Sequence, residues 1–507
     1  MVKKLYLIGI DSTPLWILKE LSLENGMDAI STMIKKGYFH DLESTLPPMT
    51  GPAWPSIYTG LTPAEHGVPD FFAMKDDYTP DIIYYNPQEH PPFWEILARK
   101  GYKSLLITPA TDTKLPDNSN IDIITGFPLK AKTNSLMLEK LMRKYKFDGE
   151  PDIEKDIKAG KMSELEASKI FAESVSTRIS IAKEAMSKAN YDFVFVCFTE
   201  TDRLQHFVMN KKNRKEYLLP IYSKISTFLG ELMELADKED SALMVVSDHG
   251  MQPIKSKFLI NAWLIHNNYA KLKPNILSTI SAKSSQKTTN STILYQLREK
   301  LMKTWLRKVY DKLPYKAKTA VFNLIGKVAS GASSGEYTRI HLFDYDLTKT
   351  KVFAAVSNDP VSTIWINDSR FRNGLVKTSE KARLKKEIME KLSKIKAEDG
   401  SLLIKDLIDG NDYYGNTKKF IPADIIAEVK SNYTVDIFNF SNDTIFMEPE
   451  AAKSGDHMRH GVMAFYSRNV GKFSKNASVL NIAPTIINYF GIKNELSKNS
   501  ILKHLVD

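Results

Sequence analysis

Three short apolar runs, each ending at or just before acidic or histidine residues, constrain the fold of this 507-residue chain most strongly. The run LYLIGI leads into Asp11, FVFVCF ends shortly before Asp202, and ALMVVS ends at Asp248 and His249. Short, nearly continuous runs of this composition are typical of parallel strands buried on both faces. Ligands of open α/β sheets bind at the carboxyl ends of the strands, so we expect these polar side chains to meet at one edge of a sheet.

Two residue pairs at these strand ends have spacings that suit a metal ion. Asp202 and His206 are four residues apart, which places both side chains on one face of a helix. Asp248 and His249 are adjacent and can reach one cation only where the chain turns, and Gly250 supplies the freedom to turn. Each pair alone also fits an exposed helix turn or an ordinary loop. Their positions after buried strands favour the metal-site interpretation.

Thr50 lies after two prolines and directly before Gly51, at the start of a predicted helix. A threonine at this point commonly caps the helix N-terminus. The same location also offers free N–H groups and the positive end of the helix dipole to a phosphate, and a metal-bound hydroxyl there is a usable nucleophile. Both interpretations of Thr50 are open from its local sequence.

These motifs, in this order, resemble the type I phosphodiesterase / nucleotide pyrophosphatase family of the alkaline phosphatase superfamily. The resemblance extends from IGID near residue 8 to NIAPTIINYFGI, which ends at residue 492. Thr50 precedes the pair Thr59-Gly60 by nine residues, and a P-x-x-HG element follows at 63–67, as in the family. The resemblance implies an α/β fold with an alkaline-phosphatase-like, mostly parallel central sheet flanked by helices.

The resemblance also implies two divalent metal ions and a catalytic role for Thr50, which would form a threonyl-phosphate intermediate. The implied ligand sets are Asp11, Thr50, Asp248 and His249 for one metal, and Asp202, His206 and His457 for the other. Nitrogen and oxygen ligands without thiolates favour zinc, and manganese or iron also fit them.

Two positions need comment beside the family pattern. The Gly-x-His spacing of the family selects His457 over its neighbour His460. Many eukaryotic members have an asparagine three residues after the nucleophile, where it contacts a phosphate oxygen, and this chain has Ala53. A preference for nucleotides therefore does not follow from the resemblance. His66 is expected to form local hydrogen bonds and is not counted as a ligand.

The predicted organisation is a catalytic core with two inserted regions. It comprises the core at 1–265, a basic helical insertion at 266–340, a smaller cap subdomain at 341–445, and the return of the core at 446–507. The resemblance suggests that the cap flanks the metal site and shapes the leaving-group pocket. Asn358, Tyr413 and Tyr414 are candidates to line that pocket.

The net charge of +10 is concentrated in the first insertion, where residues 271–330 contain 13 Lys and Arg against two acids. Apolar residues at helical spacing from Leu294 to Leu313 predict a basic amphipathic helix that Pro314 ends. We favour a helix packed on the catalytic core with a solvated face. The alternative is a lid, or a surface that attracts anionic substrates or the headgroups of a membrane.

The remaining composition sets the broad class. The single cysteine, Cys197, excludes disulfides within the chain and thiolate metal clusters, and its apolar surroundings predict a packing role. No segment has the roughly 18 to 20 continuous apolar residues needed to span a bilayer. The N-terminal apolar run is short and predicts the first strand, not a signal peptide, so we expect a cytoplasmic protein.

Three classes of function fit these features to different degrees. The leading class is a metal-dependent phosphodiesterase or nucleotide pyrophosphatase acting on a small anionic phosphodiester or nucleotide; a nucleic-acid polymer is not expected. The second is a phosphomonoesterase or phosphomutase on the same scaffold, although mutase relatives typically use serine where this chain has Thr50. The third is a non-enzymatic binding protein with a basic surface, against which the seven intact metal-site positions argue.

Overall fold

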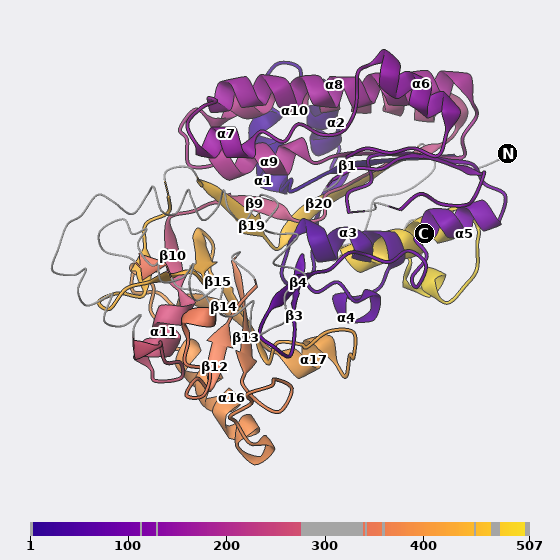
Figure 1. The fold of residues 1–507 in the computed structure, drawn as a ribbon. Coiled ribbons are helices and arrows are strands. Elements are labelled where there is room, and N and C mark those ends of the chain that lie inside the picture. The colour runs from indigo at the N-terminus through magenta and orange to yellow at the C-terminus, as the bar shows by residue number, and fades with distance from the viewer. Residues whose placement is uncertain are drawn as a thin grey trace.

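The computed structural model shows a large α/β body with a smaller body packed against one side of it (Figure 1). The described residues are 4–111, 114–127, 130–274, 338–339, 342–356, 360–450, 453–467 and 477–501. The basic helix predicted at 294–313 and the pocket candidate Asn358 lie outside these residues.

The large body is built on an eight-stranded sheet with the order β21-β2-β20-β8-β1-β7-β5-β6. Its strands are β1 (Leu5–Ile10), β2 (Phe39–Glu43), β5 (Ser104–Ile107), β6 (Ile121–Ile124), β7 (Phe193–Phe198), β8 (Ala242–Val246), β20 (His460–Tyr466) and β21 (Ala477–Ser478). Strands β8, β1, β7, β5 and β6 are mutually parallel, and β20 runs antiparallel between β8 and β2. The expected mostly parallel α/β sheet is confirmed.

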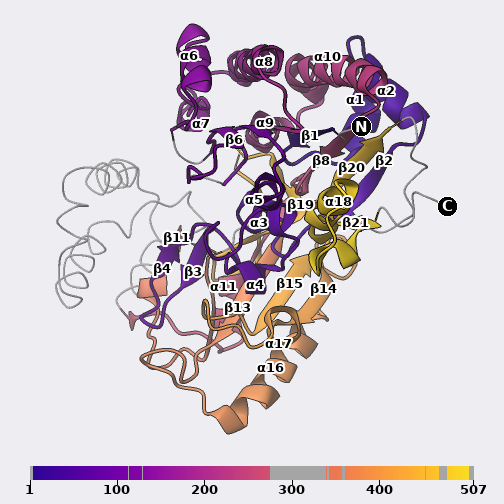
Figure 2. The same ribbon diagram turned by 90° about the vertical axis from the view of Figure 1, so that its right-hand side faces the viewer.

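Helices cover both faces of this sheet because its central strands are apolar on both sides. In β1, Tyr6 and Ile8 belong to one buried core and Leu5 and Leu7 to the other. The first face is covered by α1 (Leu15–Leu21), α2 (Asp28–Lys35), α6 (Leu136–Lys144), α8 (Glu164–Lys188), α9 (Glu200–Val208) and α10 (Arg214–Glu239). The second is covered by α3 (Thr50–Thr59), α5 (Phe93–Arg99) and α18 (Ile482–Tyr489). Figure 2 shows the sheet between these two layers.

The smaller body contains a four-stranded antiparallel sheet, ordered β12-β13-β15-β14, and a three-stranded sheet, ordered β16-β10-β18. The strands are β10 (Ser256–Leu259), β12 (Val352–Ala354), β13 (Val361–Ile366), β14 (Ile404–Asp409), β15 (Ile425–Val429), β16 (Tyr433–Asp436) and β18 (Phe446–Met447). Its helices are α11 (Ile260–His266), α16 (Thr378–Leu392) and α17 (Gly410–Tyr414). Strand β10 and helix α11, which the sequence placed in the catalytic core, pack instead into the core of the smaller body, because their apolar side chains meet those of β12, β13 and β15.

A two-stranded antiparallel ribbon connects the two bodies. It pairs β9 (Gly250–Pro253) with β19 (Gly455–Met458), so that His457 lies opposite Met251. Gln252 on β9 accepts a hydrogen bond from the backbone N–H of Asn432 at 2.9 Å and donates to the carbonyl of His457 at 3.2 Å. The ribbon is thereby attached to the turn that leads into β16 of the smaller body.

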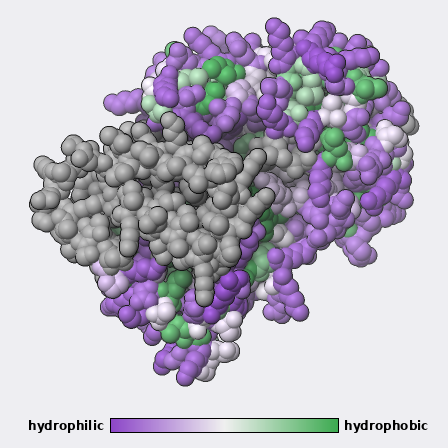
Figure 3. Space-filling view, viewed as in Figure 1, coloured by the Kyte–Doolittle hydropathy of each residue, from purple (hydrophilic) through white to green (hydrophobic). Residues whose placement is uncertain are grey.

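Short elements complete the described chain. They are α4 (Pro63–His66), α7 (Glu154–Lys158), β3 (Phe72–Met74), β4 (Pro80–Ile82), β11 (Thr338–Arg339), β17 (Asn439–Phe440) and the 3-10 turns at Leu342–Asp344, Val479–Asn481 and Leu496–Asn499. The described part of the face in Figure 3 is mainly hydrophilic, with small separate hydrophobic patches. Among the described residues, no helix has the length and apolar character required to cross a membrane.

Candidate metal centre

The three predicted strand ends lie side by side in the sheet, with β1 between β8 and β7. Asp11 follows β1, Asp248 and His249 follow β8, and Asp202 lies in the first turn of α9, which begins directly after β7. Because these strands are parallel, their carboxyl ends share one edge of the sheet, and the side chains that follow them converge there. The expected convergence is observed.

Asp11, Asp248 and His249 form a fully buried group at the centre of this edge. The Nε2 atom of His249 lies 3.2 Å from Oδ2 of Asp248 and 3.6 Å from Oδ1 of Asp11. The Nδ1 atom of the same ring lies 3.2 Å from the carbonyl oxygen of Gly250, which can accept a hydrogen bond from it. That arrangement would leave the lone pair of Nε2 directed at the carboxylates, the tautomer that a metal ligand needs.

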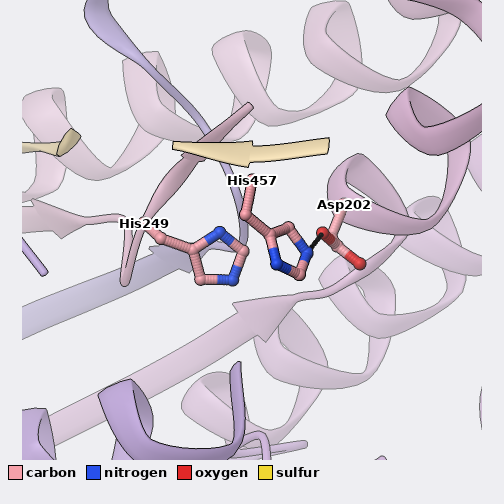
Figure 4. Close-up of side chains that lie close together, drawn as sticks. All are labelled: Asp202, His249 and His457. Atoms are coloured by element: carbon pink, nitrogen blue, oxygen red, sulfur yellow. Dashed lines mark ion pairs between the residues drawn. The ribbon is translucent and has the colours of Figure 1, made fainter. Parts of the chain in front are cut away.

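Asp202, His206 and His457 lie beside this group. Oδ1 of Asp202 is 3.5 Å from Nε2 of His206 and 3.3 Å from Nε2 of His457. Nδ1 of His206 lies 3.0 Å from the carbonyl oxygen of Gly455, so its other ring nitrogen points to the carboxylate. Figure 4 shows His457 between Asp202 and His249, with the dashed line marking its ion pair to Asp202.

The two groups are joined through His249. Its ring centroid is 4.3 Å from that of His457, and its ligand atom lies within 4.8 Å of ligand atoms of both Asp202 and His457. The resemblance assigned His249 to one metal alone, whereas the geometry places it between the two candidate groups. The described residues therefore bring all the predicted carboxylate and imidazole ligands into one continuous centre.

Thr50 is the first residue of α3, and Met49, not Thr50, occupies the N-cap position. Its Oγ1 atom lies 3.5 Å from Oδ1 of Asp11 and 3.4 Å from Nε2 of His249. The hydroxyl is thus directed to the metal centre and does not cap its own helix. The N-terminal end of α3 brings its positive dipole to the same place, where it favours an anion.

The electrostatics of the centre show how much negative charge is packed together. Burial raises the pKa of Asp11 well above its ordinary value, and repulsion from Asp248 adds to the effect. Burial raises the pKa of Asp248 to about 7, with repulsion from Asp202 contributing. Burial alone would raise the pKa of Asp202 as well, but attraction to His206 and His457 outweighs it and holds that pKa well below the ordinary value.

This combination of groups fits a pair of divalent cations. Oδ1 of Asp202 and Oδ2 of Asp248 are buried oxygen atoms that accept no hydrogen bond from the described residues. Buried polar atoms are normally satisfied, so carboxylate oxygens that face imidazole nitrogens without accepting a hydrogen bond fit a site for a cation. A cation would neutralise the two carboxylates whose pKa values burial has raised.

The raised pKa values predict how the stability of the metal-free protein depends on pH. Asp11 and Asp248 hold a proton more tightly in the folded chain than in the unfolded chain, so this contribution is lost as pH rises. We expect the free energy of unfolding of the metal-free protein to decrease as the pH rises from 3.8, the ordinary pKa of an aspartate, to about 7, the pKa of Asp248 in the folded chain. Urea denaturation at several pH values measures this, and Asp248→Asn should flatten the dependence. An unchanged pH profile in that variant would contradict the prediction.

A buried ion network behind the centre was not anticipated from the sequence. Arg178 of α8 is fully buried and donates to the carbonyl of Cys197 at 2.7 Å and to Thr108 Oγ1 at 2.9 Å. It also pairs with Glu150 at 3.3 Å and with Glu200, the first residue of α9. The network joins the ends of β5 and β7 to α9, the helix that carries Asp202 and His206.

Several side chains around the ligands hold the backbone in place. Thr201 donates from Oγ1 to the carbonyl of Asp11 at 2.6 Å, and Gln205 donates from Nε2 to the carbonyl of Ser12 at 2.8 Å. On β19, Asp456 accepts a hydrogen bond from the Thr434 hydroxyl of the smaller body. Such supporting partners fix the orientation of metal ligands.

Other residues singled out from the sequence lie away from the ligand groups. His66 accepts a hydrogen bond on Nδ1 from the Val68 N–H and contacts Ser56 Oγ at 3.0 Å, and burial lowers its pKa to about 3. It is therefore a neutral, local hydrogen-bonding residue. His460 begins β20, pairs with Glu43 in the sheet, and belongs to neither candidate group of described residues.

The two tyrosines proposed for a leaving-group pocket have structural contacts. Tyr413 accepts a hydrogen bond from the N–H of Leu46 at 2.8 Å, four residues before Thr50. Tyr414 is buried and packs against Phe420, with ring centroids 5.4 Å apart. Their role toward a substrate stays a prediction.

The chain belongs to the type I phosphodiesterase / nucleotide pyrophosphatase family, whose sequence profile matches residues 5–350. This family lies in the alkaline phosphatase superfamily, so the protein is a phosphodiesterase/pyrophosphatase-family hydrolase. No significant match was found among curated protein sequences.

The solved structures that match this chain include the following two. Phosphonoacetate hydrolase from Sinorhizobium meliloti 1021, in complex with phosphonoacetate, is similar with a TM-score of 0.53 at 12% identity, over 98% of this chain and 96% of that one. Murine ectonucleotide pyrophosphatase / phosphodiesterase 5 gives a TM-score of 0.47 at 13% identity, over 97% and 96%. At these identities the first comparison establishes the fold alone.

Proposed function

We propose that the protein hydrolyses phosphodiester or pyrophosphate bonds of small anionic substrates with two divalent metal ions and a threonyl-phosphate intermediate. The observation that carries the proposal is the position of the Thr50 hydroxyl, 3.5 Å from Asp11 Oδ1 and 3.4 Å from His249 Nε2. A hydroxyl at a helix N-terminus, beside a carboxylate and an imidazole that would share its cation, is placed to act as a nucleophile.

The ligands would divide between two cations that lie next to each other. Asp11, Thr50, Asp248 and His249 would hold one, and Asp202, His206 and His457 the other, with His249 close to both. When bound, such cations acidify the hydroxyl and neutralise charge on the attacking and leaving oxygens of an in-line displacement. Zinc fits the nitrogen and oxygen donors best, and manganese and iron remain alternatives.

The reaction then follows from the chain's own groups. The Thr50 hydroxyl gives up its proton to solvent, its Oγ1 attacks phosphorus, and the bond from phosphorus to the leaving oxygen breaks, so that the leaving group departs as an alcohol or phosphate that takes its proton from solvent. A water molecule then loses a proton and attacks phosphorus opposite Oγ1, the bond from phosphorus to Oγ1 breaks, and Oγ1 takes up a proton, which restores the hydroxyl and releases the phosphorus product. The N-terminal end of α3 would stabilise the negative charge that develops on the phosphoryl oxygens.

A competing function is hydrolysis of a phosphorus compound with a doubly charged group, either a phosphomonoester or a phosphonate. This alternative is raised by the name of phosphonoacetate hydrolase, a protein of similar fold. Family membership favours the diester, and both substrate types are small phosphorus anions. The substrates of the two functions differ in the charge on the reacting phosphorus group and in the number of its ester bonds. A comparison of substrates therefore distinguishes the two functions.

The test compares three substrates on the zinc-loaded and manganese-loaded protein. We expect bis-p-nitrophenyl phosphate to be hydrolysed with a higher kcat/KM than p-nitrophenyl phosphate or phosphonoacetate. Removal of metal with a chelator should abolish turnover, and added metal should restore it. A higher kcat/KM for the monoester or for phosphonoacetate would move the competing function to first place.

A further inference from the structure

We infer that Trp54 is a positioning residue that fixes the Asp11 carboxylate through its indole N–H, so that one chosen oxygen faces the metal centre. This inference rests on the proposed function, because it concerns how a ligand of that centre is oriented. Trp54 and Asp11 are both fully buried, and Nε1 of the indole donates to Oδ2 of the carboxylate at 3.0 Å.

The two oxygens of Asp11 have different surroundings. Oδ2 accepts the hydrogen bond from Trp54. Oδ1 lies 3.5 Å from Thr50 Oγ1 and 3.6 Å from His249 Nε2. Rotation of the carboxylate would break a buried hydrogen bond and leave the indole N–H without its acceptor, which is costly. The indole therefore selects Oδ1 as the atom offered to the centre.

The helix α3 couples this selection to Thr50. Thr50 and Trp54 are four residues apart, so their side chains project from one face of the helix. A single turn thus directs a hydroxyl to Oδ1 and an N–H to Oδ2 of the same carboxylate. Any shift of α3 along its axis would disturb both contacts together.

Gly9 of β1 makes room for the indole. A Cβ atom at Gly9 would lie 2.7 Å from Cη2 of Trp54, whose indole also reaches Asp11, the residue that follows β1. Such a contact is too short, and the rigid indole has no flexible end that could move away. The ring therefore extends over β1 from Gly9 to Asp11, and Phe195, with its ring centroid 6.0 Å away, packs against it.

Trp54→Phe tests the inference, because it keeps an aromatic ring and removes only the N–H donor with part of the ring. The metal-free protein is titrated with zinc alone, in competition with a chromophoric chelator. We expect the variant to bind the first zinc about 10- to 100-fold more weakly than wild type, the usual effect of losing a partner of a metal ligand. The visible absorption of the cobalt-substituted protein should also change, since Oδ2 becomes available to the metal.

Two matched controls distinguish the effect of losing the indole N–H from the effect of altered packing around the ring. Trp94 is also a buried tryptophan, packed against Tyr58 and away from the ligands, so Trp94→Phe should bind zinc as wild type does. Phe195→Leu loosens the packing of the Trp54 indole but leaves its N–H, and should likewise keep the zinc affinity within about threefold.

Gly9→Ala tests the inference by a second route, because it disturbs the position of the indole without removing its N–H. Its added methyl group would lie 2.7 Å from the indole and 3.0 Å from Cys197 Sγ, so we expect the indole to shift and zinc affinity to fall although Trp54 is intact. This variant decides the question if Trp54→Phe does not fold. Zinc affinity within threefold of wild type in Trp54→Phe, or an equal loss in Phe195→Leu, would overturn the inference. If wild type binds none of zinc, manganese and iron, the proposed function itself fails; if wild type binds two zinc ions and the variant binds them equally, only the positioning role fails.

Discussion

Thr50→Ala is expected to abolish turnover while leaving the metal content at two ions per chain. The substitution removes one buried hydroxyl from the start of α3 and leaves every carboxylate and imidazole of the centre in place. Loss of a covalent nucleophile typically lowers kcat by several orders of magnitude, so we expect a decrease of about 10⁴-fold or more. Steady-state kinetics on the diester, with metal analysis of the same samples, measures both effects.

Thr50→Ser is the matched control, because it keeps a hydroxyl at the same position. It should retain measurable turnover and accumulate the covalent enzyme adduct on acid quenching, detected as a mass increase of one p-nitrophenyl phosphoryl group when bis-p-nitrophenyl phosphate is the substrate. Wild type should show the same adduct and Thr50→Ala should not. Turnover of Thr50→Ala within tenfold of wild type would reject Thr50 as the nucleophile.

Asp202→Asn is expected to reduce the metal content from two ions to one. Oδ1 of Asp202 lies between Nε2 of His206 and Nε2 of His457, at 3.5 and 3.3 Å. Without its negative charge, two neutral imidazoles remain to hold the second cation, whereas Asp11 and Asp248 still hold the first. A bound cation contributes several kcal/mol of charge stabilisation, so turnover should fall by about 10³-fold.

Asp152→Asn is a suitable control, because Asp152 is an exposed acid that pairs with Lys155 on the surface. It should keep two metals and wild-type turnover. Metal analysis by mass spectrometry after gel filtration gives the count for both variants. Two tightly bound ions in Asp202→Asn would show that this carboxylate is not a ligand.

Much of the centre was predictable because its ligands follow strands that can be recognised locally. Asp11 and the pair Asp248 and His249 come directly after apolar runs, and parallel strands bring such positions together without further information. The helical spacing of Asp202 and His206 is also a local property. The position of each of these residues depends on the local sequence, which is why it could be predicted.

The remaining features depend on contacts between distant segments. The sharing of His249 between the two groups requires the position of His457, which β19 fixes by pairing with β9 about 200 residues earlier. The hydrogen bond of Trp54 to Asp11 spans 43 residues, and the ion pair of Arg178 with Glu200 is buried among elements from four parts of the chain. A sequence pattern shows the residue types but not these partners.

The attachment of the β9–β19 ribbon has a practical consequence for protein engineering. Asp456, next to His457, is bonded to Thr434, and Gln252 connects Asn432 to the backbone of His457. A chimera that exchanges the smaller body to obtain a new substrate range would therefore remove hydrogen bonds that support the second candidate group. Donor sequences for such grafts should supply a hydroxyl at position 434 and an equivalent turn at 432, so that the backbone around His457 keeps its hydrogen bonds.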